Sequence, residues 1–224
     1  MSKAIEDLLF DVRAGNEWHM QFSERCALLY ILDRIKPDIS IEIGTFQCGS
    51  LAAIAAASQN VYTFDIDTID HGSRFPNTRF ITGDSAETLP KIIDDANNSS
   101  REINFILVDG SHSEEGVLRD LIECLRYRPK TRPTVVVMHD SANPAVRRGI
   151  EHAPWNESPY VHMLDLDFVP GMLYDRSDIM GQMWGGLAVA VMLPTPRDGH
   201  VAIHSTFAHS FAVLAEKSIY ATAL

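Results

Sequence analysis

The sequence has few cysteines and few basic residues, and each shortage excludes a class of protein. Cys26, Cys48 and Cys124 are odd in number, widely spaced and without a C-x-x-C pair. This disfavours a disulfide framework or a structural zinc site and suggests a reducing, cytoplasmic compartment. Lysine and arginine total 19 against 30 aspartate and glutamate residues, giving a formal net charge of −11. That charge disfavours an extended phosphate-binding face, so we expect no nucleic-acid partner.

Long apolar runs, internal repeats and low-complexity tracts are also missing. No apolar run approaches the roughly 18 residues needed to cross a bilayer. The first ten residues, MSKAIEDLLF, hold no signal-peptide apolar core of useful length, so we expect no membrane association. With 224 residues and 46% hydrophobic content, the chain is long enough for one sizeable core, and we expect one domain over residues 1–224.

The most informative stretch covers residues 38–67 and reads DISIEIGTFQCGSLAAIAAASQNVYTFDID. Its isoleucines predict a buried parallel strand, followed by a turn with two glycines that let the backbone approach a ligand closely. The alanine-rich residues 51–57 predict a helix, and residues 61–64 a second strand that ends at Asp65. The Asp65 carboxylate can accept hydrogen bonds from two ribose hydroxyls. This order of elements is typical of the nucleotide-binding half of an α/β fold.

The glycine spacing indicates which nucleotide is bound. A dinucleotide-binding turn follows G-x-G-x-x-G and aims a helix N-terminus at a pyrophosphate. Here the pattern from Glu42 to Ser50 is E-x-G-x-x-x-x-G-S. An acid in this place would repel a pyrophosphate but would help to hold a cationic ligand; an ordinary turn without a ligand is the alternative. The stretch resembles motif I of the class I S-adenosylmethionine (SAM) methyltransferases, whose cofactor carries a sulfonium and an ammonium but no phosphate.

Further elements follow from the same patterns. Apolar spacing predicts a short helix in the first dozen residues and another that starts near Ser23, its cap, and stops at Pro37. Residues 16–22 form either a strap over the core or part of a lid over the cofactor. Further strands are expected at residues 79–81, 103–108 and 134–138, and a helix at 114–126. Residues 161–168 resemble an edge strand, residues 187–193 a buried antiparallel strand, and residues 207–218 a C-terminal helix.

Acidic and imidazole side chains fall at the ends of three predicted strands. Asp65 follows the second strand, Asp109 and His112 follow the fourth, and His139 and Asp140 follow the fifth. Ligands of open α/β sheets collect at these carboxyl ends. Since the fourth and fifth strands are expected to be neighbours, the last four side chains should converge. Convergent carboxylates and imidazoles can bind a divalent cation or act in acid–base catalysis.

A second, more specific resemblance begins at this rim. Residues 105–121, FILVDGSHSEEGVLRDL, are similar to the D-G-x-H-S-Y-E-x-V-x-x-D-L segment of the macrocin-type and other sugar O-methyltransferases and the cephalosporin-hydroxylase-like proteins. VVVMHD, residues 135–140, resembles the strand that follows in that group. The resemblance runs from about residue 23 to residue 149. It implies a Rossmann-like α/β fold with a mostly parallel seven-stranded sheet, order 3-2-1-4-5-7-6, and helices on both faces.

The same resemblance implies a division of labour along the chain. Residues 1–36 would supply N-terminal helices or a lid, residues 38–150 the SAM-binding core, and residues 151–224 the substrate side and the C-terminal segment. The cofactor would contact Glu42, Gly44, Thr45, Gly49, Ser50, Asp65, Ile66, Gly83, Asp84, Ser85 and Asp109.

In the macrocin type a divalent metal, usually magnesium, assists the reaction. Carried over, its ligands would be Asp109, His139 and Asp140, and His112 would be the general base that takes the acceptor's proton. Here His139 replaces an acid, which leaves manganese, iron or zinc as alternatives to magnesium. His139 could instead support the ligands without binding the metal, and His112 could simply belong to the start of a helix.

The resulting hypothesis is a cytoplasmic, metal-assisted SAM-dependent O-methyltransferase that acts on a hydroxyl of a sugar or small tailored metabolite. A non-haem iron oxygenase that uses His112, His139 and one aspartate is an alternative, and a SAM-binding protein without catalysis is another. The methionines and aromatic residues of 155–185 could line an acceptor pocket or simply pack. The apolar C-terminal residues IYATAL hint at a homo-oligomer.

Overall fold

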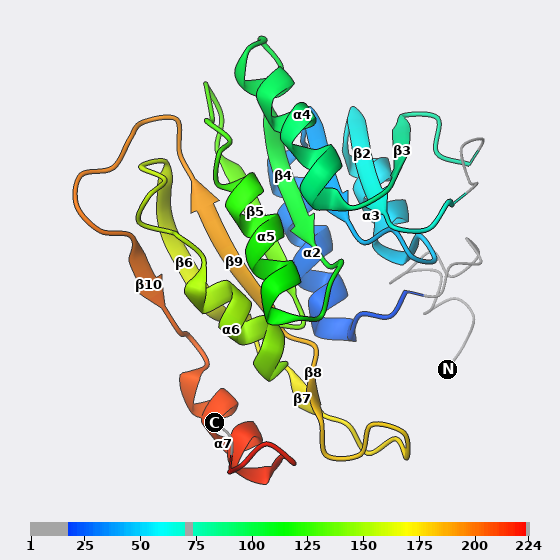
Figure 1. Cartoon of the computed structure of the whole chain (residues 1–224), viewed down its shortest axis with the longest axis vertical. Coiled ribbons are helices and arrows are strands. Elements are labelled where there is room, and N and C mark those ends of the chain that lie inside the picture. Colours follow the sequence, from blue (N-terminus) through cyan, green and yellow to red (C-terminus); the bar gives the residue numbers. More distant parts are fainter. Residues whose placement is uncertain (1–17, 70–73, 223–224) are drawn as a thin grey trace.

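A computed structural model describes residues 18–69 and 74–222, and its central element is an eight-stranded sheet with helices on both faces (Figure 1). The helix predicted for the first dozen residues lies outside the described ranges. Within those ranges, no helix combines the length and the apolar character needed to cross a membrane.

Strands and helices alternate along most of the chain. The strands of the large sheet are β1 (Ile39–Ile43), β2 (Asn60–Asp65), β3 (Thr78–Thr82), β4 (Ile103–Val108), β5 (Thr134–His139), β6 (Val161–Val169), β9 (Leu187–Met192) and β10 (Ala202–His204). The hairpin strands are β7 (Met172–Leu173) and β8 (Met183–Trp184). The helices are α2 (Phe22–Ile35), α3 (Gly49–Ala57), α4 (Ser85–Asn97), α5 (Glu114–Cys124), α6 (Pro144–His152) and α7 (Ala208–Lys217).

The strand order confirms the predicted Rossmann-like sheet. It runs β10-β6-β9-β5-β4-β1-β2-β3, in which β1 to β5 are parallel and β9 lies antiparallel between β5 and β6. With β9 as the predicted seventh strand, the order 3-2-1-4-5-7-6 is reproduced. One strand of this sheet was not predicted: β10 pairs in parallel with β6, so residues 161–168 are internal and not an edge strand. Thr206, just after β10, donates its backbone N–H to Asp165 of β6 at 3.1 Å and so fixes this addition.

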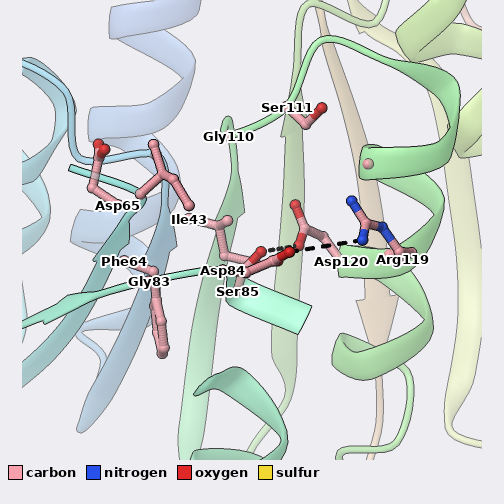
Figure 2. A pocket seen from close by; sticks show the side chains of 13 residues that line it. Ile43, Phe64, Asp65, Gly83, Asp84, Ser85, Gly110, Ser111, Arg119 and Asp120 are labelled. Atoms are coloured by element: carbon pink, nitrogen blue, oxygen red, sulfur yellow. Dashed lines mark hydrogen bonds and ion pairs between the residues drawn. The ribbon is translucent and has the colours of Figure 1, made fainter. Parts of the chain in front are cut away.

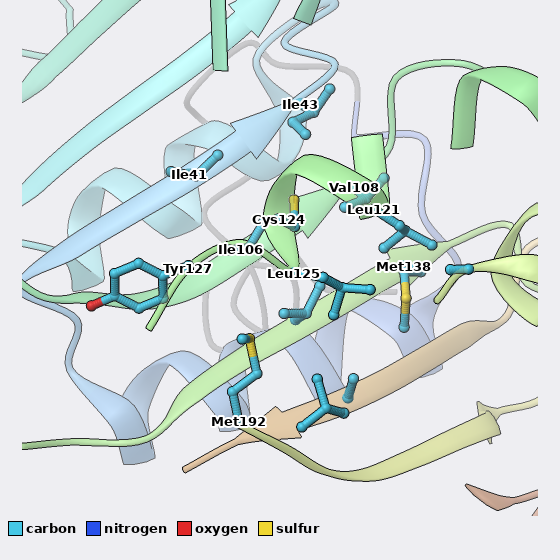
Figure 3. Close-up of a cluster of buried hydrophobic side chains, with 14 of the residues drawn as sticks. Ile41, Ile43, Ile106, Val108, Leu121, Cys124, Leu125, Tyr127, Met138 and Met192 are labelled. Atoms are coloured by element: carbon cyan, nitrogen blue, oxygen red, sulfur yellow. The ribbon is translucent and has the colours of Figure 1, made fainter. Parts of the chain in front are cut away.

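The sheet separates two apolar clusters because successive side chains of a strand point to opposite faces. On β4, Ile106 and Val108 pack toward α4, α5 and α6, in the cluster drawn in Figure 3. Phe105 and Leu107 of the same strand pack toward α2 and α3. All six side chains of β4 are buried, which is why its sequence INFILV is almost continuously apolar. A sheet covered on both faces leaves its carboxyl edge as the place for a site.

The starts of two helices, α2 and α4, matter for this edge, and that of α2 differs from the prediction. The cap of α2 is Gln21, not Ser23, and Gln21 forms a capping box with Glu24. The cap of α4 is Asp84, whose carboxylate accepts the Ala86 N–H at 2.9 Å. Ser85 is the first residue of α4, and its hydroxyl bonds to Asp120 and not to the start of the helix.

Candidate functional site

The turn after β1 depends on glycine at one position. Gly44 has φ +97°, and a Cβ there would lie 2.1 Å from the carbonyl oxygen of Asp109 at the end of β4. The ends of β1 and β4 therefore lie so close together that only glycine fits at this position. The turn then enters α3 through Cys48, which has φ 62° and provides no side-chain cap hydrogen bond. Gly49 and Ser50, the first residues of α3, line a cavity of about 570 Å³, and a smaller cavity of about 280 Å³ adjoins it.

Glu42 lies under this turn and not in it. Its side chain is fully buried, and its two carboxyl oxygens accept hydrogen bonds from the hydroxyls of Ser50 and Thr63, each at 2.6 Å. Burial raises the pKa of Glu42 to about 8, although the two hydroxyls act in the opposite direction. Glu42 lines neither cavity. From the sequence we expected it to act directly on the charge of the cofactor; in the structure it is a mostly neutral acid that ties α3 to β1 and β2.

Asp65, for which the sequence predicts a ribose contact, lies at the seam between the two cavities. One carboxylate oxygen accepts the Phe46 N–H at 2.8 Å and the other accepts the Asp67 N–H at 3.0 Å. A carboxylate has lone pairs for further hydrogen bonds after these two. Asp65, Gly44, Ile66 and Gly110 line both cavities, so the two spaces meet along this line.

The smaller cavity lies over the β1–β4 seam and toward α4 and α5 (Figure 2). Ile43, Phe64 and Ile66 give it apolar walls. Its polar side chains come from the end of β2, the start of α4, the turn before α5 and the middle of α5. The predicted contacts Gly83, Asp84 and Ser85 all line it, together with Arg119 and Asp120, for which the sequence predicted no contact.

The larger cavity extends from the Gly44 turn toward the hairpin of β7 and β8. The predicted contacts that line it are Gly44, Thr45, Gly49, Ser50, Asp65, Ile66 and Asp109. Residues 18–20, predicted as strap or lid, also line it. Of the aromatic residues in 155–185, Tyr174 and Trp184 line this cavity, whereas Trp155 is buried in the core.

A cluster of charged side chains forms one wall of the larger cavity. Ligand atoms of Asp109, His112 and Asp140 all lie within 4.8 Å of one another. His112 Nε2 is 3.2 Å from Asp140 Oδ2 and 3.9 Å from Asp109 Oδ1. Trp184 packs edge-on against the His112 ring at a centroid distance of 5.3 Å. Two carboxylates and one imidazole that face a common point suit a divalent cation.

His139, one of the predicted metal ligands, lies beside this group and is held differently. Its Nδ1 is 3.0 Å from Asp109 Oδ1, and its Nε2 is 3.2 Å from Glu24 Oε2. With a carboxylate at each ring nitrogen, both nitrogens serve as donors and no lone pair remains for a metal. The compact ligand set of the structure therefore contains His112 in the place that the resemblance gave to His139.

The charges in the cluster stabilise one another. Asp109 and Asp140 raise the pKa of His112 to about 9. Burial alone would raise the pKa of Asp140, but His139 and His112 hold it below its usual range. Burial would lower the pKa of His139, but Asp109 and Asp140 raise it well above its ordinary value. In the absence of a cation, the two imidazoles therefore carry protons that offset the buried carboxylates.

The surrounding backbone supports this arrangement. Asp140 has φ 55°, a left-handed conformation that is uncommon outside glycine and asparagine. Its Oδ1 accepts the Gly185 N–H at 2.6 Å, and Glu24 Oε1 accepts the Gly186 N–H at 2.5 Å. A Cβ on Gly185 would lie 2.6 Å from Glu24 Oε1, so the close approach requires glycine.

Four residues that support the site were not predicted from the sequence. Glu24 had only the signal of an acid in the first turn of a helix, and its contacts span 115 residues to His139. Asp120 had the V-x-x-D-L pattern, but nothing assigned it a contact. The pair Gly185–Gly186 carried only the signal of a turn before the predicted strand at residues 187–193. Contacts between distant segments decide these roles, which is why the local sequence did not reveal them.

Comparison with known proteins agrees with this fold. Residues 41–141 match a family model described as a methyltransferase domain. No curated protein gives a significant match.

Solved structures share the fold at low sequence identity. The O-methyltransferase from Bacillus cereus in complex with SAH has a TM-score of 0.56 and 15% identity, over 86% of this chain and 92% of that one. TomG, an O-methyltransferase of tomaymycin synthesis from Streptomyces achromogenes in complex with SAM, has a TM-score of 0.52 and 15% identity, over 86% of this chain and 90% of that one. Cofactor-bound Rv0187 from MTB has a TM-score of 0.55 and 15% identity, over 84% of this chain and 86% of that one.

The chain therefore has the fold of the class I methyltransferases, and residues 41–141 are similar to a methyltransferase domain. The predicted fold is confirmed at this level, and the SAM-dependent activity belongs to the proposal that follows.

Proposed function

We propose that the protein transfers a methyl group from SAM to a hydroxyl of a sugar or other small metabolite, assisted by a divalent cation. The observation that supports this most directly is the wall of the larger cavity, which joins the Gly44 turn to the cluster of Asp109, His112 and Asp140. A donor bound at the turn and an acceptor bound at the cluster would share one space. Such proximity supplies much of the rate of a group transfer.

The two joined cavities suit the two ends of SAM. The adenine would occupy the smaller, apolar-walled cavity, and the ribose hydroxyls would donate to Asp65 at the seam. The methionine part would then extend into the larger cavity beside α3. The start of α3 has no side-chain cap, so its backbone N–H groups suit the cofactor's carboxylate.

Asp109, His112 and Asp140 would hold the cation, because they are the described group with a compact set of oxygen and nitrogen ligands. A cation bound there would lower the pKa of the acceptor hydroxyl. Asp109 and Asp140 would bind the cation with their carboxylates, and Trp184, which packs edge-on against the His112 ring, would hold that imidazole in place. His139 orients Asp109 and stays protonated between Asp109 and Glu24. Tyr174 and Trp184 would pack on the acceptor.

The oxygenase alternative has less support. A facial triad for non-haem iron requires two imidazoles and one carboxylate. The structure offers one imidazole with two carboxylates, and the second imidazole, His139, has both nitrogens engaged.

Calorimetric titration with SAH, with and without magnesium, tests the proposal, followed by a methyl-transfer assay on hydroxylated acceptors. Absence of SAH binding in metal-replete buffer would remove it. H112A separates the two roles open to His112. A metal ligand predicts loss of both cation binding and turnover, whereas a general base predicts loss of turnover with cation binding retained. H152A is a matched control, since His152 is an exposed histidine paired with Glu114 outside both cavities.

A further inference from the structure

We infer that Asp120 reads the exocyclic amine of the cofactor's adenine and makes the site selective for a 6-aminopurine over a 6-oxopurine. This inference rests on the proposed function, because it takes the smaller cavity to be the adenine site. It gives α5 a role in selecting the purine base of the cofactor, whereas the sequence linked this helix only to the cluster of Asp109, His112 and Asp140.

The geometry places a carboxyl group with one free oxygen at this cavity. Asp120 is 3% exposed and lines the cavity. Its Oδ1 accepts the Ser85 hydroxyl at 2.5 Å, which fixes the orientation of the group (Figure 2). Among the described residues, no hydrogen bond reaches Oδ2. That oxygen lies 3.7 Å from the point where a Cβ of Gly110 would be, and Gly110 is on the seam between the two cavities.

The Asp120 side chain is almost fully buried, and its second carboxyl oxygen, which has no partner among the described residues, can take a donor from a ligand in the cavity. Burial raises the pKa of Asp120 to about 6, against the effect of the Ser85 hydroxyl, so the group is ionised at pH 7.5 and can only accept. Adenine presents an amino group at its 6-position, whereas hypoxanthine presents a carbonyl oxygen there. A carboxylate attracts the first and repels the second.

Asp84, the other acid at this cavity, is less suited to the role. One of its oxygens caps α4 through the Ala86 N–H. The other lies 3.7 Å from Arg119, and the Asp84 side chain is 43% exposed. Water can therefore satisfy Asp84, and its contribution to selectivity should be small. The buried Asp120 has no such substitute and discriminates more strongly.

Calorimetric titration with SAH and with S-inosylhomocysteine at pH 7.5 tests the inference. The wild-type protein should bind SAH on the order of 10- to 100-fold more tightly, as expected for one charge-assisted hydrogen bond. D120N keeps the acceptor for Ser85 but turns an amide toward the ligand, so the preference should fall to near one or reverse. S85A frees the carboxylate to rotate, and its preference should fall by a smaller factor.

E115Q provides the matched control. Glu115 is exposed on the same helix and lines neither cavity, so the wild-type preference should remain. Tight SAH binding with equal binding of the inosyl analogue would overturn the role of Asp120 and leave the proposed function standing. A preference lost in D84N but kept in D120N would assign the amine to Asp84 and also overturn it. Absence of SAH binding by the wild-type protein would instead mean that the proposed function fails.

Discussion

Two buried acids at the same edge of the sheet have opposite protonation. Glu42 at the end of β1 is 0% exposed, and Asp140 after β5 is 6% exposed. Hydroxyls surround the first, and its pKa rises to about 8; the imidazoles of His112 and His139 surround the second, and its pKa falls below the usual range. Equal burial therefore does not determine charge at this edge. The partners determine it, since hydroxyls stabilise a buried carboxylate far less than a cation does.

The comparison separates a supporting region from a reactive one. The β1–α3–β2 side holds a neutral acid and a turn that fits closely against Asp109. The β4–β5 side gathers ionised acids that can exchange a proton on His112 for a bound cation. Changes on the first side should mainly affect stability, whereas changes on the second should mainly affect chemistry.

The largest effect is expected for G44A, on the supporting side. Its Cβ would lie 2.1 Å from the Asp109 carbonyl oxygen, at a backbone φ of +97°. We expect a loss of more than about 3 kcal/mol in the free energy of unfolding, because two strand ends must move apart. Urea denaturation measures it. G199A is the control: Gly199 has φ +78°, but a Cβ added there would have no atom within 4 Å, so only the backbone cost of about 1–2 kcal/mol applies. Equal losses in the two variants would contradict the close approach.

D140N should affect the reactive side without disturbing the fold. Asparagine tolerates the left-handed φ of 55° and can still accept the Gly185 N–H, but it removes the charge that faces His112. We expect cation binding to be lost and kcat to fall by about 10²- to 10⁴-fold, with SAH affinity nearly unchanged. Calorimetry and a methyl-transfer assay measure these quantities. D95N, at an exposed position on α4, should leave both at wild-type values. Full turnover in D140N would refute the assignment.

The protonation of Glu42 gives a pH-dependent prediction. The folded protein keeps this proton up to about pH 8, whereas the unfolded chain releases it near the ordinary glutamate pKa of about 4.3. Between these values the folded state binds more protons, so the contribution to stability falls as pH rises, by up to about 1.4 kcal/mol per pH unit. E42Q resembles the protonated form and should lose this dependence. The difference in unfolding free energy between the two proteins, measured from pH 5 to pH 8, should therefore change steadily. A constant difference would mean that Glu42 is ionised in the folded state.

Local patterns predicted the fold better than the site. The apolar runs and the glycine turn predicted β1 to β5, because each of these elements depends on neighbouring residues, and the family resemblance supplied the order of the sheet. β10 was missed because its three residues carry no strand pattern, and pairing with β6 alone defines it. The convergence of Asp109, His112 and Asp140 followed from the strand order. The engagement of His139 by Glu24 did not, since it depends on how α2 packs across the sheet.

The smallest effect concerns the starts of two helices at this edge. α3 begins without a side-chain cap, whereas the Ser113 hydroxyl caps α5 by accepting the Gly116 N–H at 3.1 Å. If the start of α3 is reserved for the cofactor and that of α5 is not, S113A should cost about 1 kcal/mol of stability and leave SAH affinity within twofold. Urea denaturation and calorimetry measure the two quantities. S100A, at an exposed loop position, should cost almost nothing. A large loss of SAH affinity in S113A would mean that the first turn of α5 helps to hold the cofactor. Cofactor binding would then involve the β4–β5 side as well as the β1–α3–β2 side.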